Sequence, residues 1–324
     1  MSVHDSERGA RAVLAAISNA GKRDLSGFVA RFGAVAAIEH LRSRAGSASW
    51  HRTALKRLNG ANPWDWAEAI LERTDRVGAR IAIPTDSQWP MSLNDLSALS
   101  DTTDVDLAPP LCLWIRGPLE LGAITRRAIS LVGARASTPY GVHAARQLGY
   151  DVARRDWTVV SGAAYGIDAA AHRGALAAMG PTIAVLGCGV DVPYPAGNTN
   201  LLEELAECCL VMSEWPPGTR PARHHFLVRN RVIAALGAGT VVVEAARRSG
   251  SRATARYAVD LGRALMAVPG PITSALSEGA HELIREWRGE LVTTAQHVIE
   301  LVGPYGDLEV PKPVEETQES GYVG

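Results

Sequence analysis

The chain has 324 residues, of which 47% are hydrophobic and 21% charged, and its formal net charge at pH 7 is −1. This composition supports a full hydrophobic core and excludes a disordered or collagen-like chain. The length allows one large domain, or a main domain with a small partner. The near-neutral charge conceals an asymmetry: residues 305–324 carry five acids and one Lys, a net of −4, which leaves +3 on residues 1–304.

The basic residues are 30 Arg and only 3 Lys. Arginine suits planar, two-point contacts with phosphate, although a GC-rich genome produces the same bias. The four cysteines form no C-x-x-C pair, and the vicinal Cys208 and Cys209 are poorly placed for a disulfide. The first residues are polar, and no apolar run approaches the roughly 18 residues of a membrane span. We therefore expect a soluble, cytoplasmic protein with reduced thiols and no membrane partner.

In chain order, the first elements are helical. Residues 11–42 predict small helices, and 47–75 continue in helical register with Trp50, Trp64 and Trp66 among the apolar anchors. The segment 81–121 contains four prolines and a polar stretch, which predicts an extended connector that ends in a short strand at 111–116.

From residue 124 onward, apolar strands alternate with amphipathic helices. The predicted strands are 128–132, 157–160, 182–186, 210–213, 240–244 and 264–268. The predicted helices are 139–155, 167–178, 201–208, 230–236 and 253–262. These β–α alternations predict an α/β fold with a doubly wound, mostly parallel sheet covered on both faces. Ligands in such sheets bind at the carboxyl ends of the strands.

Glycine-rich turns lie at those strand ends. Glycine lets the backbone approach a ligand, and the helix that follows offers free N–H groups to an anion. Several such turns with Arg nearby predict a phosphate-binding rim. The candidate residues in these turns are Gly133, Arg135, Ser137, Ser161, Gly162, Gly166, Gly250, Arg252 and Thr254.

The densest cluster is Arg223-His224-His225-Phe226, followed by Arg229-Asn230-Arg231. Arginines can contact backbone phosphates, and the aromatic rings offer stacking faces to unpaired bases. The alternative is an arginine network that ties the loop to acids such as Glu214 and Glu244.

Other chemistries have weaker support. The G-x-G-x-x-G fingerprint and the P-loop are both absent, which counts against NAD binding and nucleotide triphosphatase activity, so we predict no cofactor. Asp168 and His172 could form an acid–base pair, but a helix cap and a structural histidine are the preferred interpretation. The histidines show no metal-ligand spacing with carboxylates, so no metal site and no catalytic residue are predicted.

These blocks occur in an order that resembles the DNA-processing protein A family (DprA, also called Smf). The resemblance covers about residues 81–301. Its blocks are Val132-Gly133-Ala134-Arg135, Ser161-Gly162, Gly166-Ile167-Asp168, Val185-Leu186-Gly187-Cys188-Gly189, Tyr194-Pro195, Ser213-Glu214, Arg229-Asn230-Arg231, Ser249-Gly250-Ser251 and Val268-Pro269-Gly270-Pro271.

The resemblance implies an extended Rossmann-like fold and a homodimer that binds single-stranded DNA. It also implies that the protein protects incoming or processed DNA and loads the RecA recombinase during natural transformation and recombination. By position, Arg135 corresponds to a phosphate-contacting arginine, and Phe226 to a base-stacking aromatic. The implied domains are a small helical (SAM-like) domain over 1–80, a connector over 81–122, the DNA-binding domain over 123–303, and a disordered acidic tail over 304–324.

Two departures from the family pattern affect the expected site. Ala196 stands where many members carry a DNA-contacting Lys, and Arg252 could compensate for that lost charge. The tail after Gly303 is short, so we expect no terminal winged-helix domain.

A plain interaction scaffold is one alternative function. The other is a nucleotide phosphoribohydrolase resembling the Lonely guy family, suggested by Gly239-Thr240 and Glu244.

Overall fold

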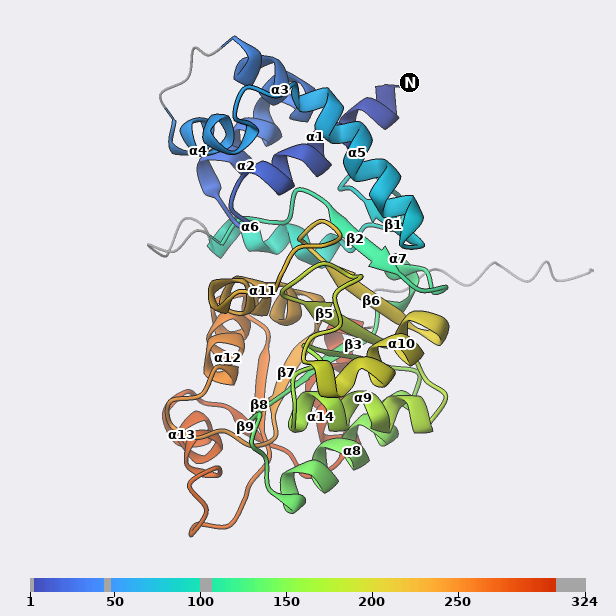
Figure 1. Ribbon diagram of the computed structural model, residues 1–324. Helices are drawn as coiled ribbons and strands as arrows, with labels where there is room; N and C mark the ends of the chain where they lie inside the picture. The colour runs from blue at the N-terminus through green and yellow to red at the C-terminus, as the bar shows by residue number, and fades with distance from the viewer. Residues whose placement is uncertain (1–2, 44–47, 100–106, 307–324) are drawn as a thin grey trace, which may run out of the picture.

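The computed structural model describes residues 3–43, 48–99 and 107–306 (Figure 1). The N-terminal part is a bundle of helices that pack around their own core, which includes Leu14, Ile38 and Trp50. Its last long helix begins at Pro63, where the Asn62 side chain accepts a hydrogen bond from the backbone N–H of Trp64. The helices are α1 (Val3–Ile17), α2 (Arg23–Phe32), α3 (Ala34–Arg42), α4 (Ser49–Leu58) and α5 (Pro63–Arg76).

In the described residues after α5, the strands form one nine-stranded sheet, in the order β1-β2-β6-β5-β4-β3-β7-β8-β9. In this spatial order, the strands from β6 through β5, β4, β3, β7 and β8 to β9 run parallel to one another. By contrast, β1 pairs antiparallel with β2, and β2 pairs antiparallel with β6. The predicted mostly parallel α/β sheet is thus confirmed. The strands are β1 (Ala79–Ala82), β2 (Leu113–Arg116), β3 (Ala128–Val132), β4 (Thr158–Ser161), β5 (Thr182–Leu186), β6 (Leu210–Ser213), β7 (Gly239–Val242), β8 (Ala264–Ala267) and β9 (Glu290–Leu291).

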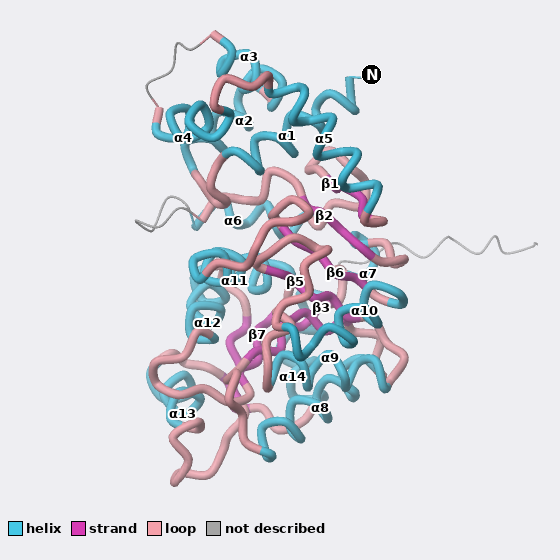
Figure 2. Tube along the Cα trace, viewed as in Figure 1, coloured by secondary structure: helices cyan, strands magenta, loops and turns pink. Residues whose placement is uncertain are grey.

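Helices cover both faces of the sheet, so the strands lie between two helical layers (Figure 2). One face packs against α11 (Arg223–Leu236), α12 (Ser251–Asp260) and α13 (Glu278–Glu286). The opposite face packs against α8 (Pro139–Ala153), α9 (Ile167–Ala177) and α14 (Ala295–Gly306) near the centre, and against α10 (Thr199–Cys208) toward β6. Two buried faces explain why the strands are apolar throughout instead of alternating.

The predicted connector over 81–122 is more ordered than its prolines suggested. It contributes β2 and the end of β1 to the sheet, together with η1 (Met91–Asp95), α6 (Leu96–Leu99) and α7 (Leu121–Ile124). Trp89, Leu93 and Leu96 are buried in the same core as the sheet. The predicted tail over 304–324 lies outside the described residues from 307 on, and α14 continues to Gly306.

Helices α8 and α9 approach each other at two glycines. A Cβ on Gly174 would overlap the carbonyl oxygen of Arg146 and lie 2.8 Å from the nitrogen of Tyr150. A Cβ on Gly149 would likewise overlap the carbonyl oxygen of Ala171. These contacts are with backbone, which cannot move aside as a flexible side chain can. The two glycines therefore fix the close packing of α9, the helix that follows β4.

We expect Gly174→Ala to lower the free energy of unfolding by about 1–3 kcal/mol, because the added methyl overpacks this interface. Gly27→Ala is the matched control: Gly27 also lies in a helix, but its Cβ would have no neighbour within 4 Å. The control should be neutral, or more stable by about 0.5–1 kcal/mol. Urea unfolding measures both; equal stability of the two variants would contradict the close-packing interpretation.

Candidate nucleic-acid interface

A cavity of about 380 Å³ opens at the carboxyl ends of the parallel strands. Strands β4, β5 and β6 extend from β3 in one direction, and β7 and β8 in the other. The cavity is lined by the turn after β3, by the start of α9, by α11 and by the loop that leads into α12. It therefore lies at the topological switch point, where doubly wound sheets bind their ligands.

The interior of this strand-end cavity is organised by Arg229, whose side chain is 4% exposed. Its guanidinium donates to the carbonyl oxygen of Gly162 at 2.9 Å and to that of Val185. Burial lowers the pKa of Arg229 to about 10, partly offset by the charge of Asp168, so the group stays protonated at neutral pH. Gly162 leaves room for this guanidinium, because a Cβ there would lie 2.6 Å from the guanidinium carbon and would displace it. Arg229 thus connects two strand ends while giving the cavity a fixed positive charge.

Asp168 lies at the start of α9 and also lines the cavity. It accepts a hydrogen bond from the backbone N–H of Gly162 at 3.2 Å. Burial raises the pKa of Asp168, and Arg229 together with backbone hydrogen bonds opposes that shift. The N-cap of α9 is Gly166 and no side chain caps this helix, so the preferred interpretation of Asp168 as a helix cap is wrong. Because the carboxylate repels anions, a phosphate ligand is expected nearer the mouth of the cavity than its interior.

The mouth carries an exposed cation beside stacked rings. The guanidinium carbon of Arg135 lies 5.4 Å from the centre of the Phe226 ring. Phe226 in turn stacks on Tyr194, with ring centroids 5.3 Å apart and planes 25° apart. Arg135 is exposed and Phe226 is half-buried. This arrangement combines a phosphate-binding group with an aromatic surface in one place.

Two glycines position the turn that carries Arg135. Gly166 has φ +77°, and a Cβ there would overlap the carbonyl oxygens of Ala134 and Arg135. A Cβ on Gly133 would lie 2.6 Å from Ile167 Cγ1. Both positions therefore require glycine for the turn after β3 to pack against α9.

Of the predicted site residues, half line the cavity and half do not. The members of the cavity are Gly133, Arg135, Phe226, Arg229, Asn230, Gly250 and Thr254. Gly162 and Gly166 do not line the cavity, but they pack against residues that do: Gly162 against Arg229, and Gly166 against Ala134 and Arg135. Ser137 and the exposed Arg223 lie on the surrounding surface, outside the cavity lining.

Three predicted contacts are oriented elsewhere. Arg231 is fully buried, and its five N–H groups are used within the protein: on both oxygens of Glu214, on Val228 and twice on Ala108. Arg252 forms an ion pair with Glu282 at 2.6 Å and lies over the Trp287 ring. The hydroxyl of the buried Ser161 donates to the carbonyl oxygen of Leu131. These three side chains bind other parts of the protein, and they do not line the strand-end cavity.

Several lining residues were not among the predicted ones: Asp168, Leu227, Ser249 and Ser251 line the cavity, and Tyr194 extends its aromatic mouth. Ser249 and Ser251 flank the predicted Gly250, so their position in the same turn was the available signal. Tyr194 follows the glycine turn after β5, and its stacking role depends on the contact with Phe226, which is distant in the sequence.

The groups that could have suggested catalysis have other partners. Nδ1 of His172 lies 2.7 Å from Oγ1 of Thr182, and burial lowers the pKa of this histidine to about 3. Asp168 instead interacts with Gly162, so the two side chains form no acid–base pair. The Glu244 carboxylate accepts from the backbone N–H and hydroxyl of Thr138, the N-cap of α8. Glu244 is 2% exposed and holds the start of α8 through these two hydrogen bonds.

Two further observations concern metals and membranes. The described residues contain no cluster of three or more His, Cys, Asp or Glu side chains that could hold a metal ion. None of the described helices is long and apolar enough to cross a lipid bilayer.

Comparison with known proteins identifies the family. The DNA recombination-mediator protein A family matches residues 80–303. A DNA processing protein DprA of Mycobacterium tuberculosis is 47% identical over 250 residues, which cover 77% of this chain and 64% of that protein. The chain thus aligns with slightly less than two thirds of this relative.

Two solved structures are similar over most of their length. DNA processing protein A of Streptococcus pneumoniae superposes with a TM-score of 0.72 at 28% identity, covering 92% of this chain and 96% of that one. DNA processing protein A of Helicobacter pylori, described in a study of its single-stranded DNA binding mode, gives a TM-score of 0.58 at 26% identity, covering 68% of this chain and 94% of that one. The chain belongs to the DNA recombination-mediator protein A family.

Proposed function

We propose that this protein is a non-enzymatic, single-stranded DNA-binding mediator of recombination, which protects processed DNA and loads the RecA recombinase onto it. The observation that carries the proposal is the mouth of the strand-end cavity. There the exposed Arg135 lies over Phe226, and Phe226 stacks on Tyr194. The H. pylori relative, whose structure concerns single-stranded DNA, supports the same ligand.

The geometry favours a single strand over a duplex. A phosphate can reach Arg135 while an adjacent unpaired base stacks on the aromatic surface, and stacking tolerates any base because each has a π-face. In a duplex the bases are paired and their faces are covered by their neighbours. A duplex would therefore gain only the phosphate contact and lose the stacking contribution.

The test is binding of a single-stranded oligonucleotide and a blunt duplex of the same sequence, measured across a salt series. The single strand should bind more tightly, and its affinity should decrease as salt increases because neutralised phosphates release counterions. Equal affinity for the two forms would overturn the proposal.

Arg135→Ala is expected to weaken single-strand binding and leave the fold intact. The slope of log affinity against log salt should decrease in magnitude by about 0.7–1, the contribution of one lost phosphate contact. Arg256→Ala is the control, because Arg256 is an exposed cation on α12, 63% accessible and paired with Asp260. If both variants keep the wild-type slope, Arg135 does not contact phosphate.

The RecA partnership, the homodimer and the cytoplasmic location are parts of the same proposal. RecA filament formation on DNA coated with a single-strand-binding protein, with and without this protein, tests the partnership. The molar mass in solution tests the homodimer, and cell fractionation tests the location. Incubation with a nucleoside monophosphate tests the non-enzymatic assignment: release of free base would favour the phosphoribohydrolase alternative.

A further inference from the structure

A second cavity, of about 600 Å³, lies between the N-terminal helices and the start of α11. Its walls come from the end of α1, the loop from α1 to α2, α4, the loop after β6, and α11. We call it the interdomain cleft. Its volume lies within the range of sites that hold a small molecule or a nucleotide.

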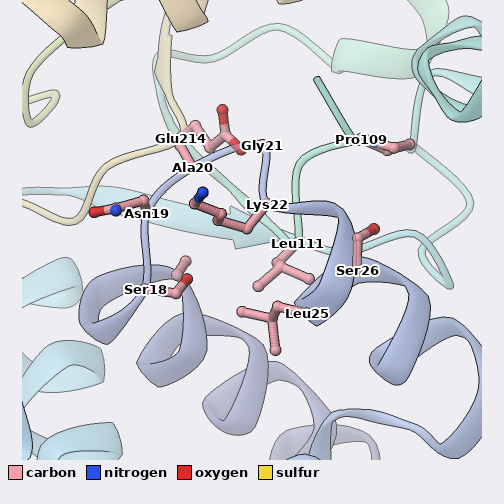
Figure 3. Close-up of a pocket in the computed structure, with 11 residues that line it drawn as sticks. Ser18, Asn19, Ala20, Gly21, Lys22, Leu25, Ser26, Pro109, Leu111 and Glu214 are labelled. Carbon is pink, nitrogen blue, oxygen red and sulfur yellow. The ribbon is translucent and has the colours of Figure 1, made fainter. Parts of the chain in front are cut away.

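The charged groups among the described lining residues of the interdomain cleft are Lys22 and Arg57, and this lining includes no Asp or Glu. His224 and His225 also line the cleft, and burial lowers the pKa of His225, which favours its neutral form. Glu214 lines a small adjoining cavity, which shares Ser18, Asn19, Ala20 and Lys22 with the cleft (Figure 3). Both oxygens of its carboxylate accept from Arg231, which offsets its charge. The cleft therefore attracts anions without an acidic side chain on its wall to oppose them.

The aromatic groups of the cleft are held in place. His225 stacks on Trp215 with ring centroids 4.5 Å apart, and its Nδ1 lies 3.1 Å from the carbonyl oxygen of Gly187. His224 contacts His225 edge-on at 4.3 Å and is exposed. Arg57 donates to Asn19 Oδ1 at 2.7 Å and to the carbonyl oxygen of Ser18, so its guanidinium is oriented as well. Such fixed groups bind with less entropic cost than mobile ones.

Helix α11 joins the interdomain cleft to the strand-end cavity. His224, His225 and Val228 line the cleft, whereas Phe226, Leu227 and Arg229 line the strand-end cavity. The first turns of this one helix therefore present one side to each cavity. In Figure 1, α11 lies at the boundary between the N-terminal helices and the sheet. A flexible chain bound at Phe226 can reach the cleft by crossing the exposed start of α11 at Arg223.

We propose that the interdomain cleft is a second subsite for the same single strand, with phosphate bound by Arg57 and a base against His224. This inference rests on the proposed single-stranded DNA binding and extends it, because it assigns a DNA contact to the N-terminal helices. A short strand fills the strand-end cavity alone, and a longer one occupies both.

The experiment uses the full chain and two oligothymidylates, of about 4 and about 16 nucleotides, the limits of common single-strand site sizes. Arg57→Ala should weaken binding of the long strand about three- to tenfold, reduce its salt slope by about one phosphate contact, and leave the short strand unchanged. Lys56→Ala is the matched control: Lys56 is the preceding, exposed cation on the same helix and does not line the cleft.

His224→Glu provides an independent test, because it places an acid in the cleft and removes no contact that holds Arg57. It should weaken the long strand alone, and His143→Glu, an exposed histidine on α8, should not. Failure of the wild-type protein to bind either strand would overturn the proposed function itself. The second subsite would be overturned if the Arg57 and His224 variants bind the long strand as tightly as the wild type does. It would also be overturned if they lose affinity by the same factor for both lengths.

Discussion

Replacing Arg231 by alanine is expected to lower the free energy of unfolding by about 3–5 kcal/mol, because it leaves the buried carboxylate of Glu214 without its counter-charge. Both oxygens of that carboxylate accept from Arg231 at 2.7 Å, and Glu214 is 5% exposed. The carbonyl oxygen of Ala108 loses two donors in the same variant. Ala108 lies in the segment that leads to β2, so the loss also loosens the attachment of this segment to α11.

Arg42→Ala is the control for this prediction. Arg42 pairs with Glu39 at 2.9 Å on the surface, with side chains 57% and 52% exposed, and such pairs contribute about 0–1 kcal/mol. Arg231→Lys should lie between the two, because an ammonium group cannot bind both carboxylate oxygens and Ala108 in the same planar geometry. Denaturant unfolding measures all three. If the Arg231→Ala protein is folded and as stable as Arg42→Ala but no longer binds DNA, Arg231 contacts DNA and is not a structural residue.

The sheet was predictable because its strands are short, apolar and separated by glycine. Strands 128–132, 182–186 and 210–213 match β3, β5 and β6 at both ends. The elements that were missed have weaker signals. Strand β1 follows directly after a helix, β9 has only two residues, and both are held by pairing with a neighbour instead of by their own sequence pattern.

The sequence indicates which turns and helix starts form the candidate site. It does not indicate which side chains in those segments point into the cavity. The sequence pattern predicts a helix from residue 230, whereas α11 begins at Arg223. Residues two apart on a helix point about 200° apart, so Arg229 faces the cavity and Arg231 faces the opposite side. The same rotation separates Thr254, in the cavity, from Arg252, which pairs with Glu282. The packing of a helix against the sheet decides which of two nearby arginines faces a ligand. The local sequence pattern does not specify that packing.

The last prediction concerns Phe226, the aromatic residue at the mouth of the strand-end cavity. Phe226→Ala should cost about 1–3 kcal/mol of single-strand affinity, the usual contribution of one base–aromatic contact. The loss should persist at high salt, because stacking does not depend on counterion release. Phe226→Trp should keep most of the affinity, since it preserves a flat surface beside Arg135. Fluorescence titration of an oligonucleotide at two salt concentrations measures each effect.

The chain offers a closely matched control for this substitution. Phe32 is 54% exposed on α2, and the guanidinium carbon of Arg31 lies 5.0 Å from its ring, as Arg135 lies 5.4 Å from Phe226. Phe32→Ala therefore removes a similar cation–π pair outside both cavities and should leave DNA affinity unchanged. Because Phe226 is half-buried against Tyr194 and Gly187, its removal should leave the protein folded. A folded Phe226→Ala protein that binds single strands as tightly as Phe32→Ala would exclude base stacking at this position, and would leave Arg135 as the exposed group that holds the strand at the mouth.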